Sequence, residues 1–415
     1  MKTKRIPALL SAVFILIGLC ACKKAPAQEP QTPEEILAQR RDIAESHMRS
    51  MATLLWRSDE DVTYSYSASV KDPLAEDAKS VVEIKAGRVY QGLPYTHAGA
   101  APGSFLEYDA DGEPDENGVY TLTALHWKPL NGDWRNTARI GNDCSSAVNQ
   151  SWAQLGNSLV SNRKTDLMCP DQGYLRVGEY ASNPAKNEIS IPVCQANGLD
   201  VMCEAYSHLQ KADGVVKRID GNGHAMMVVT NTVVRNENGK IDPEKSFVTI
   251  IDQTSDAINK DQHYFNTELG EEVYLFYRTD VEYSYQKLFD YGYLPITCKE
   301  LIDPSPVPEP AVRDTETDQA VNAMFSGNLE ATRFIDSVIV SYTDKAGNVV
   351  QQVASSGNRG NAYTFQMNTF ISDYPEAFRG KLDLQALPAG TYRYKVVCRL
   401  VTGDEFTVRD YDVTL

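Results

Sequence analysis

Apolar residues recur at helical spacing in two segments of the chain. Val148, Trp152 and Leu155 are separated by four and three residues, so they share one face of a short helix that ends at Gly156. A longer helix is predicted over residues 33–57, where two glutamates suit the N-terminal turn. The residues of this longer helix that are roughly in phase are Ile36, Ile43, His47 and Leu54. We expect this helix to pack on the domain that follows.

A second pattern, of apolar segments bounded by turn residues, predicts strands in the middle of the chain. Residues 213–219 enter a strand, a Gly-Asn-Gly turn follows, and His224 opens an apolar strand that runs to Val234. Residues 236–239 carry a turn signal, and residues 246–251 form the returning strand. His224 is therefore expected on a strand next to the polar residues 252–254.

Proline alternates with other residues over 303–310, which predicts a semi-rigid spacer. Beyond it, short strands separated by turn residues suggest a small antiparallel β-sandwich. The expected strands are 334–341, 349–354, 363–367, 381–384, 390–401 and 406–415. No residues in this part of the chain stand out as catalytic, so binding or spacing is its expected role.

The first residues have the composition of a targeting segment. Three cationic residues precede the apolar segment 8–19, which is too short to span a bilayer comfortably. The segment ends in Leu-Cys-Ala-Cys and resembles a bacterial lipoprotein signal, in which Cys22 would carry the lipid, although Cys20 is unusual before the small residue. The alternative is an ordinary secretory signal cut near Ala21. The resemblance implies a protein lipid-anchored to a bacterial membrane, on its periplasmic or cell-surface side.

Charge and cysteine content exclude some classes of function. The 415-residue chain has a net charge of −16, and removing residues 1–21, with three positive charges and no negative one, makes it about −19. Such an acidic chain argues against nucleic acid as a partner. The eight cysteines include no C-x-x-C pair, which argues against a zinc knuckle. No metal or cofactor is expected, and the disulfide pairing stays open.

Cys144 stands at the start of the predicted short helix. Asn142 and Asp143 can cap the first turn with their side-chain oxygens. The free N–H groups and the dipole at a helix N-terminus favour a thiolate, which is the form that attacks a carbonyl carbon. The alternative is a structural cysteine that happens to begin a helix.

A thiol nucleophile needs a base and a group that orients the base. In chain order the candidates are Cys144, His224 and then Asp252, with Gln253 in reserve. A lone histidine at a strand edge is usually structural, but an acid or amide on the neighbouring strand favours a catalytic role. A cysteine at a helix N-terminus that faces a histidine on a sheet is a papain-like arrangement.

Four segments resemble motifs of the NlpC-type and CHAP-type cell-wall cysteine peptidases. Asp143-Cys144-Ser145 is similar to their nucleophile motif, and residues 223–229 to their Gly-His strand. Residues 90–95 are similar to the Tyr/Gly/Pro segment that precedes the nucleophile, and residues 248–254 to the strand that carries the third polar residue. Two departures are Ser146-Ala147 after the motif and the 48 residues between Tyr95 and Cys144, which imply an insertion.

The resemblance implies an α+β, papain-like fold that hydrolyses peptide or amide bonds, in this family those of peptidoglycan stem peptides. Cys144 would attack the carbonyl, His224 would shuttle the proton, and Asp252 would orient the imidazole. Substrate-binding roles are carried onto Tyr95, Asp143 and Ser145. The expected organisation is a signal peptide (1–21), a tether and helix (22–58), a papain-like domain (59–300), a Pro-rich linker (301–315) and a β-sandwich (316–415).

Two other classes of function stay open. A transglutaminase-like acyl transferase also uses Cys, His and Asp in this order, but such domains tend to have an aromatic residue where this chain has Met226. The non-enzymatic alternative is a surface-anchored binding lipoprotein that has lost activity. Its mark would be a Cys144 that is buried or disulfide-bonded.

Overall fold

The computed structural model describes residues 31–65, 81–96, 114–122, 141–156, 165–168, 170, 173–182, 190–219, 222–315, 326–356, 361–366 and 382–415. Among these residues are helices and mostly antiparallel sheets, in agreement with the expected α+β class. The predicted signal over residues 1–21 and the predicted lipidation of Cys22 lie outside this range. Across the described ranges, no helix has both the length and the apolar character needed to cross a membrane.

Helix α1 (Pro33–Thr53) begins at a capping box. The Thr32 hydroxyl accepts a hydrogen bond from the Glu35 backbone N–H at 3.2 Å, and the Glu35 carboxylate accepts one from the Thr32 backbone N–H at 2.8 Å. The helix is shorter than predicted because strand β1 begins at Leu55. The predicted apolar stripe is wrong, since Ile43 is exposed. The buried residues of α1 are Arg40, Arg41, Ala44, Met48, Met51 and Ala52.

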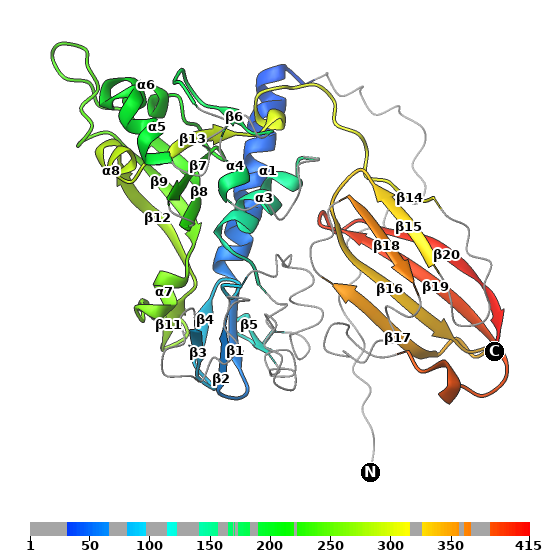
Figure 1. The fold of residues 1–415 in the computed structure, drawn as a ribbon. Coiled ribbons are helices and arrows are strands. Elements are labelled where there is room, and N and C mark those ends of the chain that lie inside the picture. The colour runs from blue at the N-terminus through cyan, green and yellow to red at the C-terminus, as the bar shows by residue number, and fades with distance from the viewer. Residues whose placement is uncertain are drawn as a thin grey trace, which may run out of the picture.

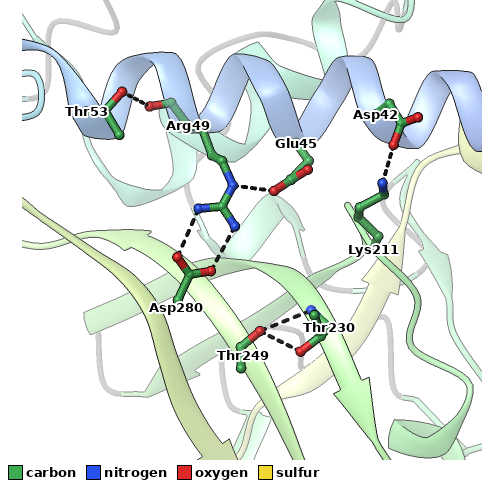
Figure 2. A network of polar contacts seen from close by, with 8 residues as sticks. All are labelled: Asp42, Glu45, Arg49, Thr53, Lys211, Thr230, Thr249 and Asp280. Atoms are coloured by element: carbon green, nitrogen blue, oxygen red, sulfur yellow. Dashed lines mark hydrogen bonds and ion pairs between the residues drawn. The ribbon is translucent and has the colours of Figure 1, made fainter.

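Charged side chains attach α1 to the rest of the fold. Arg41 bonds the buried Asp213 carboxylate at 3.0 Å. Figure 2 shows Arg49 reaching from α1 to Asp280, whose two carboxylate oxygens it bonds at 2.8 and 3.0 Å. Arginines on the buried side of α1 therefore carry contacts that an apolar-periodicity rule cannot predict.

A six-stranded sheet holds the segments that the sequence singled out, and all of its neighbouring strands are antiparallel. The predicted hairpin is confirmed, with strands close to the expected bounds. The register places Lys217 directly opposite His224 and Arg278 directly opposite Asp252. The strand order is β12 (Tyr277–Ser284), β9 (Phe247–Gln253), β8 (Asn222–Thr232), β7 (Gly214–Ile219), β13 (Leu294–Thr297) and β6 (Leu175–Arg176).

Helices cover both sides of this sheet. Figure 1 shows α1 and α3 (Cys144–Ala153) on one side, and α5 (Ser190–Asn197), α6 (Leu199–Ser207) and α8 (Tyr285–Asp290) on the other. The short α4 (Thr165–Met168) contacts β7 and β8. Trp152 anchors α3, because its ring is fully buried and its Nε1–H donates to the Ala212 carbonyl at 2.8 Å. The predicted Cys144 helix is thus confirmed, and it is packed against the sheet that carries His224.

A second sheet is mixed and lies beyond the C-terminal end of α1. Trp56 and Tyr90 stack at its centre with ring centroids 4.8 Å apart. Its strand order is β10 (His263–Asn266), β11 (Glu271–Leu275), β4 (Val89–Gln91), β1 (Leu55–Ser58) and β5 (Val119–Leu122). A separate hairpin, β2 (Val62–Ser65) and β3 (Val81–Ile84), and the short helix α7 (Ser255–Asn259) complete this part.

After the Pro-rich segment, which follows the 3₁₀ turn η3 (Lys299–Leu301), the chain forms two antiparallel sheets. Buried hydrophobic residues before and after this segment belong to separate clusters. The strand expected over 381–384 is wrong, because a 3₁₀ turn, η5 (Leu384–Ala386), begins there. The sheet orders are β14 (Val312–Asp314), β15 (Ser326–Ala331), β18 (Ala362–Gln366), and β17 (Val349–Ser356), β16 (Ile335–Thr343), β19 (Thr391–Leu400), β20 (Glu405–Thr414).

Candidate active site

Cys144 is the first residue of α3, and Asp143 is the N-cap. The Asp143 Oδ1 accepts hydrogen bonds from the Ser146 backbone N–H at 2.7 Å and from the Ser145 hydroxyl at 2.8 Å. This cap fixes the start of the helix at Cys144, where the helix dipole favours a negative charge on sulfur. Asp143 and Ser145 thus have capping roles, and their contact with a substrate stays a prediction.

Tyr95 lies beside the nucleophile segment despite the long insertion. It forms a parallel bridge with Asn142, and the backbones of Thr96 and Pro94 bond Asn142 at 2.9 and 3.1 Å. Gly141 makes this approach possible: it has φ +86°, and a Cβ there would lie 2.1 Å from the Pro94 carbonyl oxygen. The structure therefore places Tyr95 beside Asn142, which stands two positions before Cys144 in the chain.

The Asn142 side chain is not the cap that the sequence suggested. It is fully buried, accepts a hydrogen bond from the Tyr277 hydroxyl at 2.9 Å, and contacts the Met51 sulfur at 3.1 Å through Nδ2. Asn142 therefore ties the start of α3 to strand β12 and to α1. These two contacts of the Asn142 side chain fix the backbone that carries Cys144.

His224 and Asp252 meet across strands β8 and β9. The His224 Nε2 lies 2.5 Å from the Asp252 Oδ2, and the Asp252 side chain has no exposed surface. Arg278, on β12, donates to the same carboxylate through Nε at 3.1 Å and Nη2 at 2.5 Å. Since Nε2 is used by Asp252, Nδ1 is the ring nitrogen left for the Cys144 thiol, whose negative charge contributes to the raised pKa of His224.

The electrostatics of these groups favour a charged histidine. Burial alone would lower the pKa of His224, but the negative charge of Cys144 and the hydrogen bonds to Asp252 and Cys144 outweigh it and raise the pKa to about 9. Burial alone would raise the pKa of Asp252, yet its bonds to His224 and Arg278 hold that pKa below the usual range. An imidazolium held between a carboxylate and a sulfur is the arrangement a thiol hydrolase needs.

Gln253, the reserve candidate for the orienting role, does not lie on the imidazole. Its amide nitrogen donates to the carbonyls of Leu93 and Pro94 at 2.8 and 3.0 Å, and the residue is fully buried. Neighbouring residues on a strand point to opposite faces, so Asp252 and Gln253 cannot both face His224. Asp252 takes the orienting position, and Gln253 holds the loop that carries Tyr95.

Three residues at this site were missed by the sequence analysis. Arg278 and Tyr277 reach it through pairing of β12 with β9, and no local motif signals that pairing. Lys217 was missed because the predicted turn at residues 221–223 gives another register: Asn222 and Gly223 instead pair with Ile219 and Arg218, which brings Lys217 opposite His224. Sequence spacing thus finds the strands of a hairpin, but it fixes neither their exact register nor the pairing with a more distant strand.

The site so defined combines Cys144 at a helix N-terminus with a hydrogen-bonded pair of His224 and Asp252. No family model matches the chain, and no curated protein matches it. A solved structure of catalytically inactive OgpA from Akkermansia muciniphila, in complex with an O-glycopeptide substrate, is similar over 39% of this chain and 43% of that chain, with 17% identity and a TM-score of 0.19. The chain spans less than half of that structure, and at this TM-score the likeness defines neither fold nor function.

Proposed function

We propose that this protein is a cysteine hydrolase that cleaves peptide or amide bonds, using Cys144 as nucleophile and His224 as proton carrier. The observation that carries the proposal is the His224 imidazole, which bonds the buried Asp252 through Nε2 and interacts with Cys144. A cysteine-bearing helix packed on an antiparallel sheet supports a papain-like fold. Two antiparallel sheets around one hydrophobic cluster support a C-terminal β-sandwich.

The proposed reaction follows from these positions. The Cys144 thiolate attacks the carbonyl carbon, and the backbone N–H of Cys144 at the helix N-terminus donates to the oxyanion. The His224 imidazolium gives its proton to the leaving amine as the C–N bond breaks, which leaves a thioester on Cys144. Neutral His224 then takes a proton from water, the resulting hydroxide attacks the thioester, and the acid product leaves as Cys144 regains its thiolate and His224 its proton.

The substrate class and the location are proposals from the sequence motifs. Peptidoglycan stem peptides are the expected substrates, and a lipid on Cys22 would hold the enzyme at a bacterial membrane. An alternative, the non-catalytic binding lipoprotein, is favoured by one observation: Cys144 is only 4% exposed. Its other expected mark, a disulfide at Cys144, is not met, because Cys144 is a free thiol.

Iodoacetamide labelling across pH, with peptide mapping, separates these functions. If the proposal holds, Cys144 labels fast well below pH 8, and His224→Ala abolishes that rate. Cys194 and Cys203 serve as internal controls, because burial raises the pKa of each thiol to about 12. A Cys144 that labels as slowly as these two would favour the binding lipoprotein. Fast labelling leads to digestion of muropeptides, where amine incorporation instead of hydrolysis would indicate the transglutaminase-like alternative.

A further inference from the structure

Lys217 is a cationic neighbour of His224 on the strand next to β8, on the side away from Asp252. It lies on β7 directly opposite His224 on β8. Side chains of directly opposed residues in an antiparallel pair project from the same face, about 5 Å apart at Cβ. Lys217 therefore shares the face of the sheet on which His224 receives Asp252.

Aromatic rings hold the Lys217 side chain between the site and solvent. Its ammonium lies 5.0 Å from the ring centroid of Tyr293 and 5.1 Å from that of Tyr291. The Tyr293 ring also meets the His224 ring edge-on, with centroids 6.5 Å apart. Tyr291 is 48% exposed, so this row of side chains leads from the imidazole to the surface.

The charge of Lys217 is not matched by a protein carboxylate. Among the residues that the structure describes, no Asp or Glu lies within ion-pair distance of its ammonium, and the Asp256 carboxylate pairs with Lys260 at 2.8 Å. Burial lowers the pKa of Lys217, while the charges of Asp256 and Cys144 act in the opposite direction. A partly buried ammonium without an ion-pair partner is suited to receive an anionic group from a ligand.

We propose that Lys217 binds a carboxylate of the substrate next to the scissile bond, so that the enzyme prefers peptides or amides with a free carboxylate at that position. This inference rests on the proposed function, because it places the carboxylate relative to the Cys144 nucleophile. The rings of Tyr291 and Tyr293 flank the ammonium, and the exposed Tyr291 would contact the apolar part of the same substrate residue. Lys217 is thus a specificity-determining residue rather than a proton carrier.

A pair of reagents that differ only in charge tests this role without a known substrate. Iodoacetate carries a carboxylate, and iodoacetamide carries an uncharged amide in its place. At pH 7, Lys217→Met should lower the ratio of the iodoacetate rate to the iodoacetamide rate at Cys144 about fivefold, which corresponds to about 1 kcal/mol. Because both reagents attack the same thiol, a general change in Cys144 reactivity cancels in this ratio, and Lys217→Arg should retain the ratio.

The control is Lys240→Met, because Lys240 is exposed and pairs with Asp200 away from the site. It should leave the ratio as in the unchanged protein, and thermal unfolding should show that both methionine variants are folded. Fast iodoacetamide labelling with the same ratio in Lys217→Met would overturn the inference and leave the proposed function standing. Slow iodoacetamide labelling of Cys144 in the unchanged protein would overturn the proposed function and this inference with it.

Discussion

Arg278 binds both oxygens of the Asp252 carboxylate, through Nε to Oδ1 and Nη2 to Oδ2. Asp252 is fully buried and also bonds His224, so two cationic groups share one carboxylate. A buried carboxylate stays ionised only when such partners compensate its lost hydration. Arg278 therefore maintains the negative charge that orients the imidazole, although it has no contact with Cys144 in the proposed mechanism.

Arg278→Gln should destabilise the protein by about 3 kcal/mol, because it removes one partner of a buried ion pair and leaves Asp252 partly uncompensated. The Cys144 labelling rate should fall as well, since a protonated Asp252 no longer favours the imidazolium. Urea unfolding and iodoacetamide kinetics measure the two effects. Arg278→Lys is the matched control: it keeps the charge but loses the two-pronged geometry, so its loss should be smaller. Equal stability of Arg278→Gln and the unchanged protein would contradict this account.

The pKa of His224 provides a second prediction. Its value of about 9 lies above that of an unperturbed histidine, about 6.5, because of Cys144 and Asp252. The stabilisation from this histidine is therefore fully present below about pH 6.5 and is lost as the pH rises through about 9. Cys144→Ala and Asp252→Asn should each lower the pKa, since each removes a group that favours the charged ring.

An NMR titration of the imidazole signals checks this prediction. The chain has six histidines, and the signal that disappears in His224→Gln identifies the one of interest. Asp242→Asn, a change in the loop that joins β8 to β9 at the end of the hairpin away from His224, should leave that signal unaltered. A His224 signal that titrates near pH 6.5 in the unchanged protein would mean that no thiolate–imidazolium pair forms.

The parts of the site that could be predicted depend on local chain geometry. Cys144 follows from a capped helix start, and the approach of His224 to Asp252 follows from one hairpin. Gln253, the reserve candidate for the orienting role, faces away from His224, because neighbouring residues alternate between the two faces of a strand. Arg278 could not be predicted, because 26 residues separate it from Asp252 and only the pairing of β12 with β9 brings them together.

The same limit explains the error on α1. An apolar stripe was expected, but Arg40 and Arg41 lie on the buried side. Arg40 donates to the carbonyl of Asp303, and Arg41 donates to that of Leu301. Long cationic side chains can be buried when backbone carbonyls from a distant segment satisfy them, and helical periodicity contains no information about that segment.

His47 gives a third prediction, on acid stability. It lies half-buried on α1 with Nδ1 3.3 Å from the Ser151 hydroxyl, and burial lowers its pKa to about 4. The unfolded chain takes up this proton near pH 6.5, before the folded protein does, so stability is lost as the pH falls from about 6.5 to about 4. The full effect is up to about 3 kcal/mol.

His47→Gln should remove this contribution while keeping a polar group near Ser151. Urea unfolding at pH 7 and at pH 4.5 measures it as the difference between the two proteins, in which the other acid-sensitive groups cancel. The variant should lose less stability on acidification than the unchanged protein. An identical loss in both would show that His47 is protonated as readily in the folded state as in the unfolded one.

Gly141 gives the last prediction, which concerns the contact between the Tyr95 loop and the Cys144 helix. Gly141→Ala should both destabilise the protein and slow Cys144 labelling, because the added Cβ would lie 2.1 Å from the Pro94 carbonyl oxygen. The loop or the start of α3 must then move. Gly87→Ala is the matched control, because Gly87 also has a positive φ, +75°, but nothing lies within 4 Å of its added Cβ. That control should lose about 1 kcal/mol from backbone strain alone and label normally. Since backbone strain is common to both variants, the extra loss in Gly141→Ala reports the close approach of Pro94, and equal effects would refute its importance for positioning Cys144.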